Sequence, residues 1–344
     1  MFGPARADCV SAAHEEDPLP PRTASPPAGI SLRRAVIGLA LLSALYLALL
    51  LWADAQNPSY AGVSRLLPWF PAAMAMAWAS WGLRYLRWRW LLRRAGYGVA
   101  LGAGLPAYIA GFAFTATPGK VGELLRIRYF AWQGVPAARV TAAFVFERAI
   151  DLVSLLLLAL PVAAGLAGFG VVVAFVAVVI GLIAVLAWKP RLLSTVVAAL
   201  RRRGLQRPAR VARVLRDGLY GCRIWLRPTD LLLSLALGLV AWTFIAATLG
   251  LMLLPLDLQL PVLQGLAVYP LAMLAGAASM LPAGLGSTEA VMAALLVGRG
   301  LPLAQALMLA VAIRLCTMWW SILCGFACVI ALERQHARRP SGRR

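Results

Sequence analysis

Histidine and lysine are scarce in this chain of 344 residues. Its only histidines, His14 and His336, lie in polar segments near the two ends, and Lys120 and Lys189 are its only lysines. A histidine metal site or a histidine general base within the apolar part of the chain is therefore excluded. The five cysteines are scattered, and their spacing matches neither a zinc site nor a disulfide framework. We expect no bound metal.

Charge is also scarce and mostly of one sign. Only 13% of the residues are charged, with 33 basic against 13 acidic residues and a net charge of +20. No P-loop sequence is present, so we expect any energy for transport to come from a gradient or from downhill flow. We expect no cofactor. A basic excess can indicate a nucleic-acid partner, but membrane topology explains it here, and we expect no nucleic acid to bind.

Apolar residues make up 62% of the chain and gather in long runs, which is typical of a polytopic membrane protein. We predict six full spans, at about 35–53, 66–83, 141–163, 167–188, 230–254 and 303–331. Two further apolar stretches, at about 105–130 and 265–298, are broken by Pro and Gly. Each arm is too short to cross roughly 30 Å of hydrocarbon at about 1.5 Å per residue. We therefore predict two re-entrant helical hairpins; two kinked spans without a ligand are the alternative.

An internal repeat relates these two stretches. Its anchors keep an offset of 164 residues before a two-residue insertion (Ser287 and Thr288) and of 166 residues after it. The pairs are Pro106 and Pro270, Pro118 and Pro282, Gly122 and Gly286, Glu123 and Glu289, Gly134 and Gly300, Pro136 and Pro302, and Arg148 and Arg314. We predict an all-α polytopic membrane protein with two inverted-topology repeats, at about 35–163 and 167–331.

The basic residues support this topology. With both hairpins re-entrant and both termini cytoplasmic, almost all of them fall on the cytoplasmic side, as the positive-inside rule requires. We predict a disordered cytoplasmic tail at 1–29, a membrane domain at 30–332 and a basic cytoplasmic tail at 333–344, in the cell membrane. The arginine- and tryptophan-rich segment 84–94 is interpreted as a helix in the headgroup layer, and 189–228 as a basic loop on an anionic leaflet.

Several ionisable residues are predicted to lie at membrane depth, where they cost several kcal/mol unless they are paired or in a wet cavity. The predicted translocation residues are Lys120, Glu123, Arg126, Glu147, Arg148, Asp151, Ser287, Glu289 and Arg314. The alternative is a salt-bridge network that only fixes helix packing.

The breaks in the hairpins are the second candidate feature. They consist of Pro118, Gly119, Gly122, Pro282, Gly284 and Gly286. A half-helix that begins at mid-depth offers unpaired N–H groups to an anion, and Ser287 or Thr288 can cap the second one. Such a pair suits a phosphate-bearing lipid headgroup; the alternative is that the glycines serve only helix packing.

The patterns TPGKVGE…R…GVP…A…ER…D at 117–151 and LPAGLGSTE…GLP…A…R at 281–314 resemble the transmembrane region of lysylphosphatidylglycerol synthases. The resemblance covers nearly all of residues 30–332. It implies a flippase-like fold in which two re-entrant hairpins line a lipid cavity. It also implies functional positions at Glu123, Arg126, Glu147, Arg148, Asp151, Glu289 and Arg314. Only about a dozen residues follow the last predicted helix, so we expect that this chain does not itself make an aminoacyl lipid.

The sequence does not distinguish among three functions. The first is a translocase for a phospholipid or a polyprenyl-linked lipid, which is not an enzyme. The second is an intramembrane polyprenyl-phosphate phosphatase, for which Ser287 and Glu289 near a break would be relevant. The third is a non-transporting partner of a lipid or glycan synthase. A homodimer is also considered.

Overall fold

The computed structural model describes residues 65–163, 169–256 and 260–338. The predicted tail 1–29 and the predicted span 35–53 lie outside the described residues. All regular structure in the described ranges is helical. The α-helices are α3 (Phe70–Arg94), α4 (Leu101–Ala110), α5 (Arg126–Ala131), α6 (Ala137–Ala163), α7 (Phe169–Trp188), α8 (Pro190–Arg202), α9 (Gln206–Gly221), α10 (Pro228–Leu253), α11 (Val262–Ala278), α12 (Ser287–Val297), α13 (Leu303–Arg314) and α14 (Trp320–Ala337).

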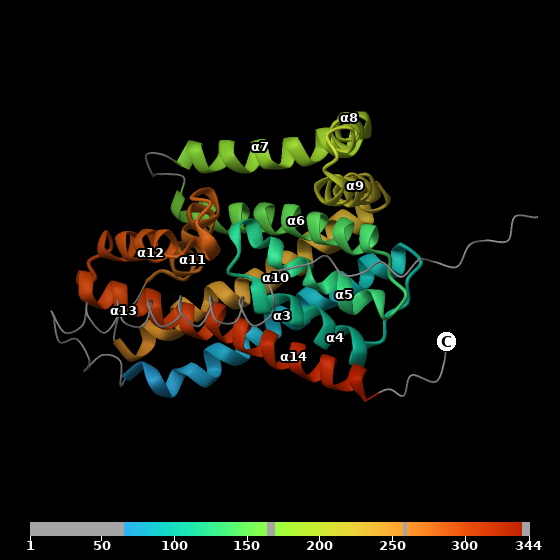
Figure 1. The fold of residues 1–344 in the computed structure, drawn as a ribbon. Coiled ribbons are helices and arrows are strands. Elements are labelled where there is room, and N and C mark those ends of the chain that lie inside the picture. The colour runs from blue at the N-terminus through green and yellow to red at the C-terminus, as the bar shows by residue number, and fades with distance from the viewer. Residues whose placement is uncertain (1–64, 164–168, 257–259, 339–344) are drawn as a thin grey trace, which may run out of the picture. The chain divides into compact units, whose positions relative to one another are not determined.

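Within the described residues, three helical segments are long and apolar enough to cross a membrane by length and composition. They are Phe169–Trp188, Pro228–Leu256 and Leu303–Ala337. Helices α3 and α6, with 25 and 27 residues, also have the length of a span, but their charged residues lower their hydropathy. Helices α3 and α10 pack against each other in the middle of the bundle, and α6 packs on both (Figure 1).

Helix α3 differs from the prediction. The segment 84–94 was expected to lie separately in the headgroup layer, and this is wrong, because α3 runs without interruption to Arg94. Arg84, Arg87 and Trp88 are buried in the bundle. Pro71 in the first turn favours the start of this helix, and Arg93 and Arg94 in its last turn interact favourably with the helix dipole.

The two broken stretches have similar backbones. In the first, α4 leads through the 3₁₀ helix Gly111–Phe114 to a second 3₁₀ helix, Pro118–Leu125, and then to α5. In the second, α11 leads through the short 3₁₀ turn Pro282–Gly284 to α12. Figure 1 shows α11 and α12 towards one end of the bundle and α4 and α5 towards the other. The two tips, Pro118–Leu125 and Pro282–Gly284, pack against each other.

The last predicted span is not a uniform α-helix. A π-helical turn, Leu315–Trp319, separates α13 from α14 directly after Arg314. Single π-helical turns inside α-helices often occur at functional sites. The C-terminal part of α14 extends to Ala337, where Glu333 forms an ion pair with Arg128 on α5 (2.8 Å) and His336 stacks on Trp132. Residues 333–337 of the predicted tail are therefore helical.

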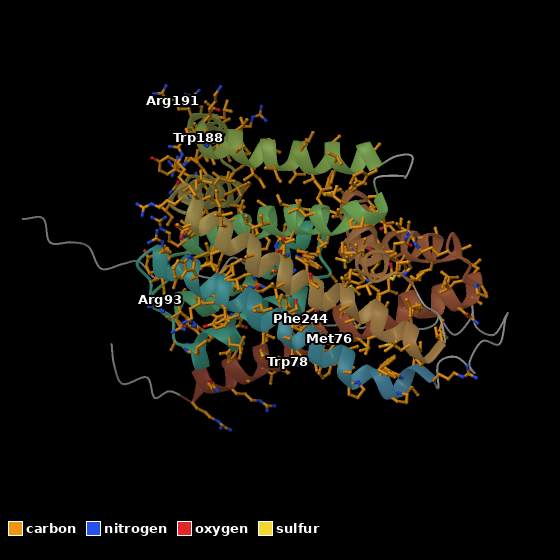
Figure 2. The ribbon with its side chains drawn as sticks, turned by 180° about the vertical axis from the view of Figure 1, so that it is seen from behind. Met76, Trp78, Arg93, Trp188, Arg191 and Phe244 are labelled. Carbon is orange, nitrogen blue, oxygen red and sulfur yellow. The ribbon has the colours of Figure 1, made fainter. Side chains whose placement is uncertain are left out.

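The basic segment 189–228 forms two helices, α8 and α9, and α9 packs on α6. Figure 2 shows Arg93 and Arg191 at one end of the molecule, which we call the basic end, and Met76, Trp78 and Phe244 along its side. Trp78 and Phe244 are exposed, although they are large and apolar. An apolar side with arginine at one end is the distribution expected for a bundle that stands in a bilayer.

Candidate functional site

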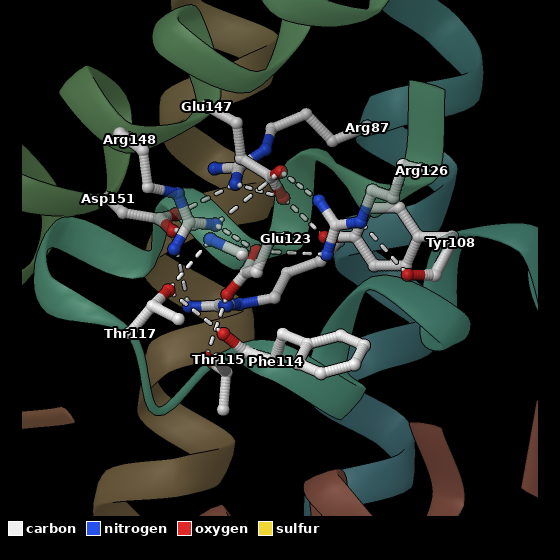
Figure 3. A network of polar contacts seen from close by, with 12 residues as sticks. Arg87, Tyr108, Phe114, Thr115, Thr117, Glu123, Arg126, Glu147, Arg148 and Asp151 are labelled. Atoms are coloured by element: carbon white, nitrogen blue, oxygen red, sulfur yellow. Dashed lines mark hydrogen bonds and ion pairs between the residues drawn. The ribbon is translucent and has the colours of Figure 1, made fainter. Parts of the chain in front are cut away.

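A network of buried charges joins the first hairpin to α3 and α6 (Figure 3). Glu147 on α6 lies at its centre and is fully buried. Its carboxylate accepts hydrogen bonds from Arg87 on α3 (3.1 Å), from Arg126 of the hairpin (3.2 Å) and from the Tyr108 hydroxyl. A carboxylate this deep is tolerated only because several donors surround it.

The helical spacing of α6 brings the other members together. Asp151 follows Glu147 by four residues, so both carboxylates lie on one face of the helix. Asp151 accepts a hydrogen bond from Arg87 at 2.7 Å and forms ion pairs with Arg84 (3.4 Å) and Arg148 (3.0 Å). Arg84 and Arg87 are three residues apart on α3 and face the same way for the same reason.

Glu123 connects this network to the tip of the first hairpin. Thr115 donates a hydrogen bond to its carboxylate at 2.9 Å, and Arg126 lies 3.0 Å from it. Arg126 also donates to the Tyr108 carbonyl (2.9 Å) and stacks on the Tyr108 ring, with its guanidinium carbon 3.9 Å from the ring centroid. Arg148 lies 3.9 Å from Glu123. The hairpin is therefore held to α6 by charge, and the stacking of Arg126 on Tyr108 joins the two arms of the hairpin.

The second hairpin has a smaller version of this arrangement. Arg314 donates to Glu289 at 2.9 Å and to the carbonyl of Ala283 at 2.7 Å. Both charged residues are buried. The pair Glu289 and Arg314 corresponds by the sequence repeat to Glu123 and Arg148, which also form an ion pair. At the positions equivalent to Glu147 and Asp151, however, the second copy has Ile313 and Thr317, so the charge is concentrated in the first half.

A cavity lies between the two hairpins. It has a volume of about 70 Å³, or about 580 Å³ when the open space at its mouth is included. The first hairpin contributes Phe112, Thr115, Lys120 and Glu123, and the second contributes Tyr269, Met273 and Ala283. The remaining wall comes from α3, α10 and the last span: Ser80, Trp81, Arg84, Trp242, Ile245, Arg314, Thr317, Met318 and Ser321. Charged and aromatic side chains thus face one another across a narrow space between the two hairpins.

The tips of both hairpins contain strained backbone. Lys120 has φ of 57°, and Met280 and Ala283 each have φ of 53°. These are left-handed conformations that glycine adopts easily and that cost other residues on the order of 1–3 kcal/mol. The position equivalent to Lys120 in the second hairpin is Gly284, with φ of 64°. A lysine therefore occupies a position where the backbone favours glycine, beside the cavity.

The predicted site residues do not all lie in one cluster. Five of them, Glu123, Arg126, Glu147, Arg148 and Asp151, form the buried network. Lys120 lines the cavity with Glu123 and Arg314, and Glu289 supports Arg314. Ser287 does neither, because its hydroxyl donates to the carbonyl of Gly284 (3.1 Å) and contacts the Ser279 hydroxyl (2.9 Å).

The predicted anion sites at the breaks need two corrections. The first tip, Pro118–Leu125, is a 3₁₀ helix and not the start of an α-helix. Its Gly122 N–H donates a hydrogen bond to the Thr117 hydroxyl at 2.7 Å and is therefore not free for an anion. At the second break, neither Ser287 nor Thr288 caps α12, whose N-cap is Gly286 without a side-chain bond. Side chains, more than helix N-termini, therefore give this site its positive charge.

Gly122 and Gly284 do allow close packing, since an added Cβ would lie 2.4 Å from the Phe114 carbonyl oxygen and 2.6 Å from the Thr288 hydroxyl, respectively.

The sequence did not identify four residues of the buried network and the cavity wall: Arg84, Arg87, Tyr108 and Trp242. The two arginines were assigned to the headgroup layer because they interleave with tryptophans. Their three-residue spacing, together with more acidic than basic residues on the predicted span at 141–163, was a signal that could have placed them in the bundle. No comparable signal singles out Tyr108 or Trp242 among the aromatic residues.

Residues 32–325 match the family described as the lysylphosphatidylglycerol synthase transmembrane region. The chain belongs to this family. The match spans both hairpins and every residue of the buried network, and the family is a membrane domain, so this chain is a helical membrane protein. Searches among curated proteins and among solved structures gave no significant match.

Proposed function

We propose that this member of the lysylphosphatidylglycerol synthase transmembrane region family is a lipid translocase, which moves a phospholipid or a polyprenyl-linked lipid between leaflets through the cavity between its two hairpins. The observation that carries the proposal is the cavity itself, which is bordered by both hairpin tips and lined by Arg84, Lys120, Glu123 and Arg314. Charged walls at membrane depth suit a polar headgroup, while the apolar sides of the bundle leave the acyl chains in the bilayer.

The arrangement of the helices supports inverted repeats around this cavity. The repeat equates α3 with α10, α4 with α11, α5 with α12, and α6 with the segment from α13 to α14. When each element is replaced by its equivalent in the other repeat, the same pairs of elements are in contact. Helix α11 packs on α6, and its equivalent α4 packs on α14. Helix α10 packs on α6, its equivalent α3 packs on the π-helical turn, and α3 and α10 pack on each other. This agreement supports a pseudo-two-fold relation between the repeats, with its axis between α3 and α10 and between the tips.

Inverted repeats that meet at a midplane site are typical of transporters that work by alternating access. In this proposal both hairpins are re-entrant, and the basic end of the molecule is cytoplasmic, with both termini on that side of the cell membrane. The two hairpins provide two arrangements, in which the cavity opens to one leaflet or the other.

Leaflet exchange in proteoliposomes tests the proposal. Dithionite quenches headgroup-labelled lipids only in the outer leaflet of the vesicles. With wild-type protein, we expect the quenched fraction of the label to exceed the outer-leaflet fraction. Thr317→Trp would fill the cavity and reduce the exchange, whereas Leu323→Trp, on the exposed side of α14, would leave it unchanged. The melting temperature of each variant in detergent controls for folding. Exchange that is absent in wild type, or that is equal in the two folded variants, would contradict the proposal.

A further inference from the structure

The charges around the cavity do not balance. Six cations belong to the network and the cavity wall, against four carboxylates, which leaves an excess of two positive charges. The cations are Arg84, Arg87, Lys120, Arg126, Arg148 and Arg314, and the carboxylates are Glu123, Glu147, Asp151 and Glu289. A buried excess of like charge is unfavourable unless a counter-charge joins it.

The excess is located at one point of the cavity wall. The Arg84 guanidinium lies 4.2 Å from the centroid of the Trp242 ring, and the Lys120 ammonium nitrogen lies 5.9 Å from the same centroid. Among the described residues, no carboxylate forms an ion pair with Lys120, and Glu123 is the one carboxylate among the residues that line the cavity. Two cations from different elements therefore converge on Trp242.

Arg84 also has hydrogen-bonding capacity left. It is 94% buried, and neither its Nε nor its Nη2 makes a hydrogen bond in the described structure, although Nη2 lies 3.4 Å from Asp151. Buried N–H groups of a guanidinium are normally satisfied, and a phosphate is a ligand whose planar oxygen pairs they fit. Lys120 adds a point charge near the same Trp242 ring, from its strained position on the hairpin tip.

On the basis of the proposed function, we infer that the cavity selects lipids whose phosphate group carries two negative charges, as a phosphate monoester or a diphosphate does. Such a headgroup neutralises the excess charge, with Arg84 and Lys120 as its direct contacts. A singly charged phosphodiester leaves one positive charge unbalanced, and zwitterionic lipids leave both. A cationic lipid, such as an aminoacylated one, adds to the excess and is bound least.

Lipid binding to the full chain in detergent, followed by native mass spectrometry, tests this inference. The probes are phosphatidic acid and a polyprenyl monophosphate, compared with phosphatidylglycerol, phosphatidylethanolamine and lysylphosphatidylglycerol. We expect the two monoesters to bind at least about tenfold more tightly than the diester, which corresponds to the loss of one close charge interaction. Inorganic phosphate serves as a soluble competitor, and we expect it to displace neither lipid at millimolar concentration.

Lys120→Gly is the informative variant, because glycine keeps the left-handed backbone without strain while the charged side chain is removed. It should reduce the preference for monoesters to about threefold or less. Arg128→Gln is the matched control. It removes a cation from the same hairpin, but Arg128 is exposed and pairs with Glu333 away from the cavity. It should keep the wild-type preference.

The inference would be overturned by equal binding of monoesters and phosphatidylethanolamine, by preferred binding of lysylphosphatidylglycerol, or by an unchanged preference in Lys120→Gly. Tight binding of inorganic phosphate would also overturn it, in favour of a site for a soluble ion. Failure of the proposed function is distinguishable: selective binding of monoesters without leaflet exchange contradicts translocation alone, and leaflet exchange with equal rates for all headgroups contradicts the selectivity alone.

Discussion

At the scale of the residue, Glu147 is the centre of the buried network. Arg87, Arg126 and the Tyr108 hydroxyl all donate to its carboxylate. Breaking a buried ion pair by removing one partner costs about 3–5 kcal/mol, mostly because the other charge stays buried without compensation. The network therefore stabilises the fold as well as forming one wall of the proposed pathway.

We predict that Glu147→Gln destabilises the protein by about 3–5 kcal/mol, because two buried arginines lose their shared counter-charge. Denaturant unfolding in detergent micelles measures this change. Asp217→Asn is the control. It also removes one carboxylate from an ion pair, but the pair with Arg216 is partly exposed, so the change should stay below about 1 kcal/mol. Equal stability of the two variants would show that the network contributes nothing beyond packing.

The sequence indicated part of this site. Ionisable residues inside apolar spans are rare and costly, so Glu147, Arg148 and Asp151 could be recognised without a structure. Arg84 and Arg87 were misplaced, because they follow an apolar run and resemble the basic end of a span, although their three-residue spacing was a signal that they lie in the bundle. Only the packing of α3 against α6 shows that they pair with those acids.

At the scale of the element, the position of the first hairpin depends on close contact with α14. The 3₁₀ helix Gly111–Phe114 packs on α14, and a Cβ added at Gly325 would lie 2.3 Å from the backbone nitrogen of Ala113. Backbone cannot move away as the end of a flexible side chain can. The missing side chain of Gly325 therefore allows the hairpin to approach.

Gly325→Ala should thus destabilise the protein by about 1–3 kcal/mol through overpacking. Helix propensity alone predicts the opposite sign, a gain of roughly 0.5–1 kcal/mol for Gly to Ala within a helix. Gly250→Ala on α10 has open space around the new Cβ and should show only the propensity effect. Thermal unfolding of both variants separates the two contributions. Stabilisation by Gly325→Ala would contradict the packing described for this hairpin.

The existence and the ends of the hairpins were predictable because Pro and Gly interrupt both apolar runs. Their local geometry was not. The first tip is a 3₁₀ helix held by Thr117, and the last span contains a π-helical turn after Arg314. The π-helical turn packs on α3, a tertiary contact that the local sequence does not encode.

At the scale of the whole molecule, the repeat predicts opposite orientations for two equivalent loops. Pro136 and Pro302 occupy corresponding positions before α6 and α13, and both are exposed. In inverted repeats they lie on opposite sides of the membrane. Pro136 should face the cytoplasm, because α5 and α4 lie towards the basic end.

Cysteine labelling tests this orientation in a background without the five native cysteines. A membrane-impermeant maleimide should label Pro302→Cys in intact cells and Pro136→Cys only after the membrane is permeabilised. Labelling of both positions from the same side would exclude inverted topology, and with it the two-fold relation on which alternating access depends.

The central claim is that the lipid headgroup passes through the cavity between the hairpins, and a reversible block tests it most directly. Ser321 lines the cavity, and Leu323, two residues later on α14, is exposed. In the background without native cysteines, a benzyl methanethiosulfonate would be attached to Ser321→Cys or Leu323→Cys in proteoliposomes, and leaflet exchange would be measured before and after reduction. We predict that exchange through Ser321→Cys stops on modification and returns on reduction, while Leu323→Cys is unaffected. Undiminished exchange through fully modified Ser321→Cys would contradict the account.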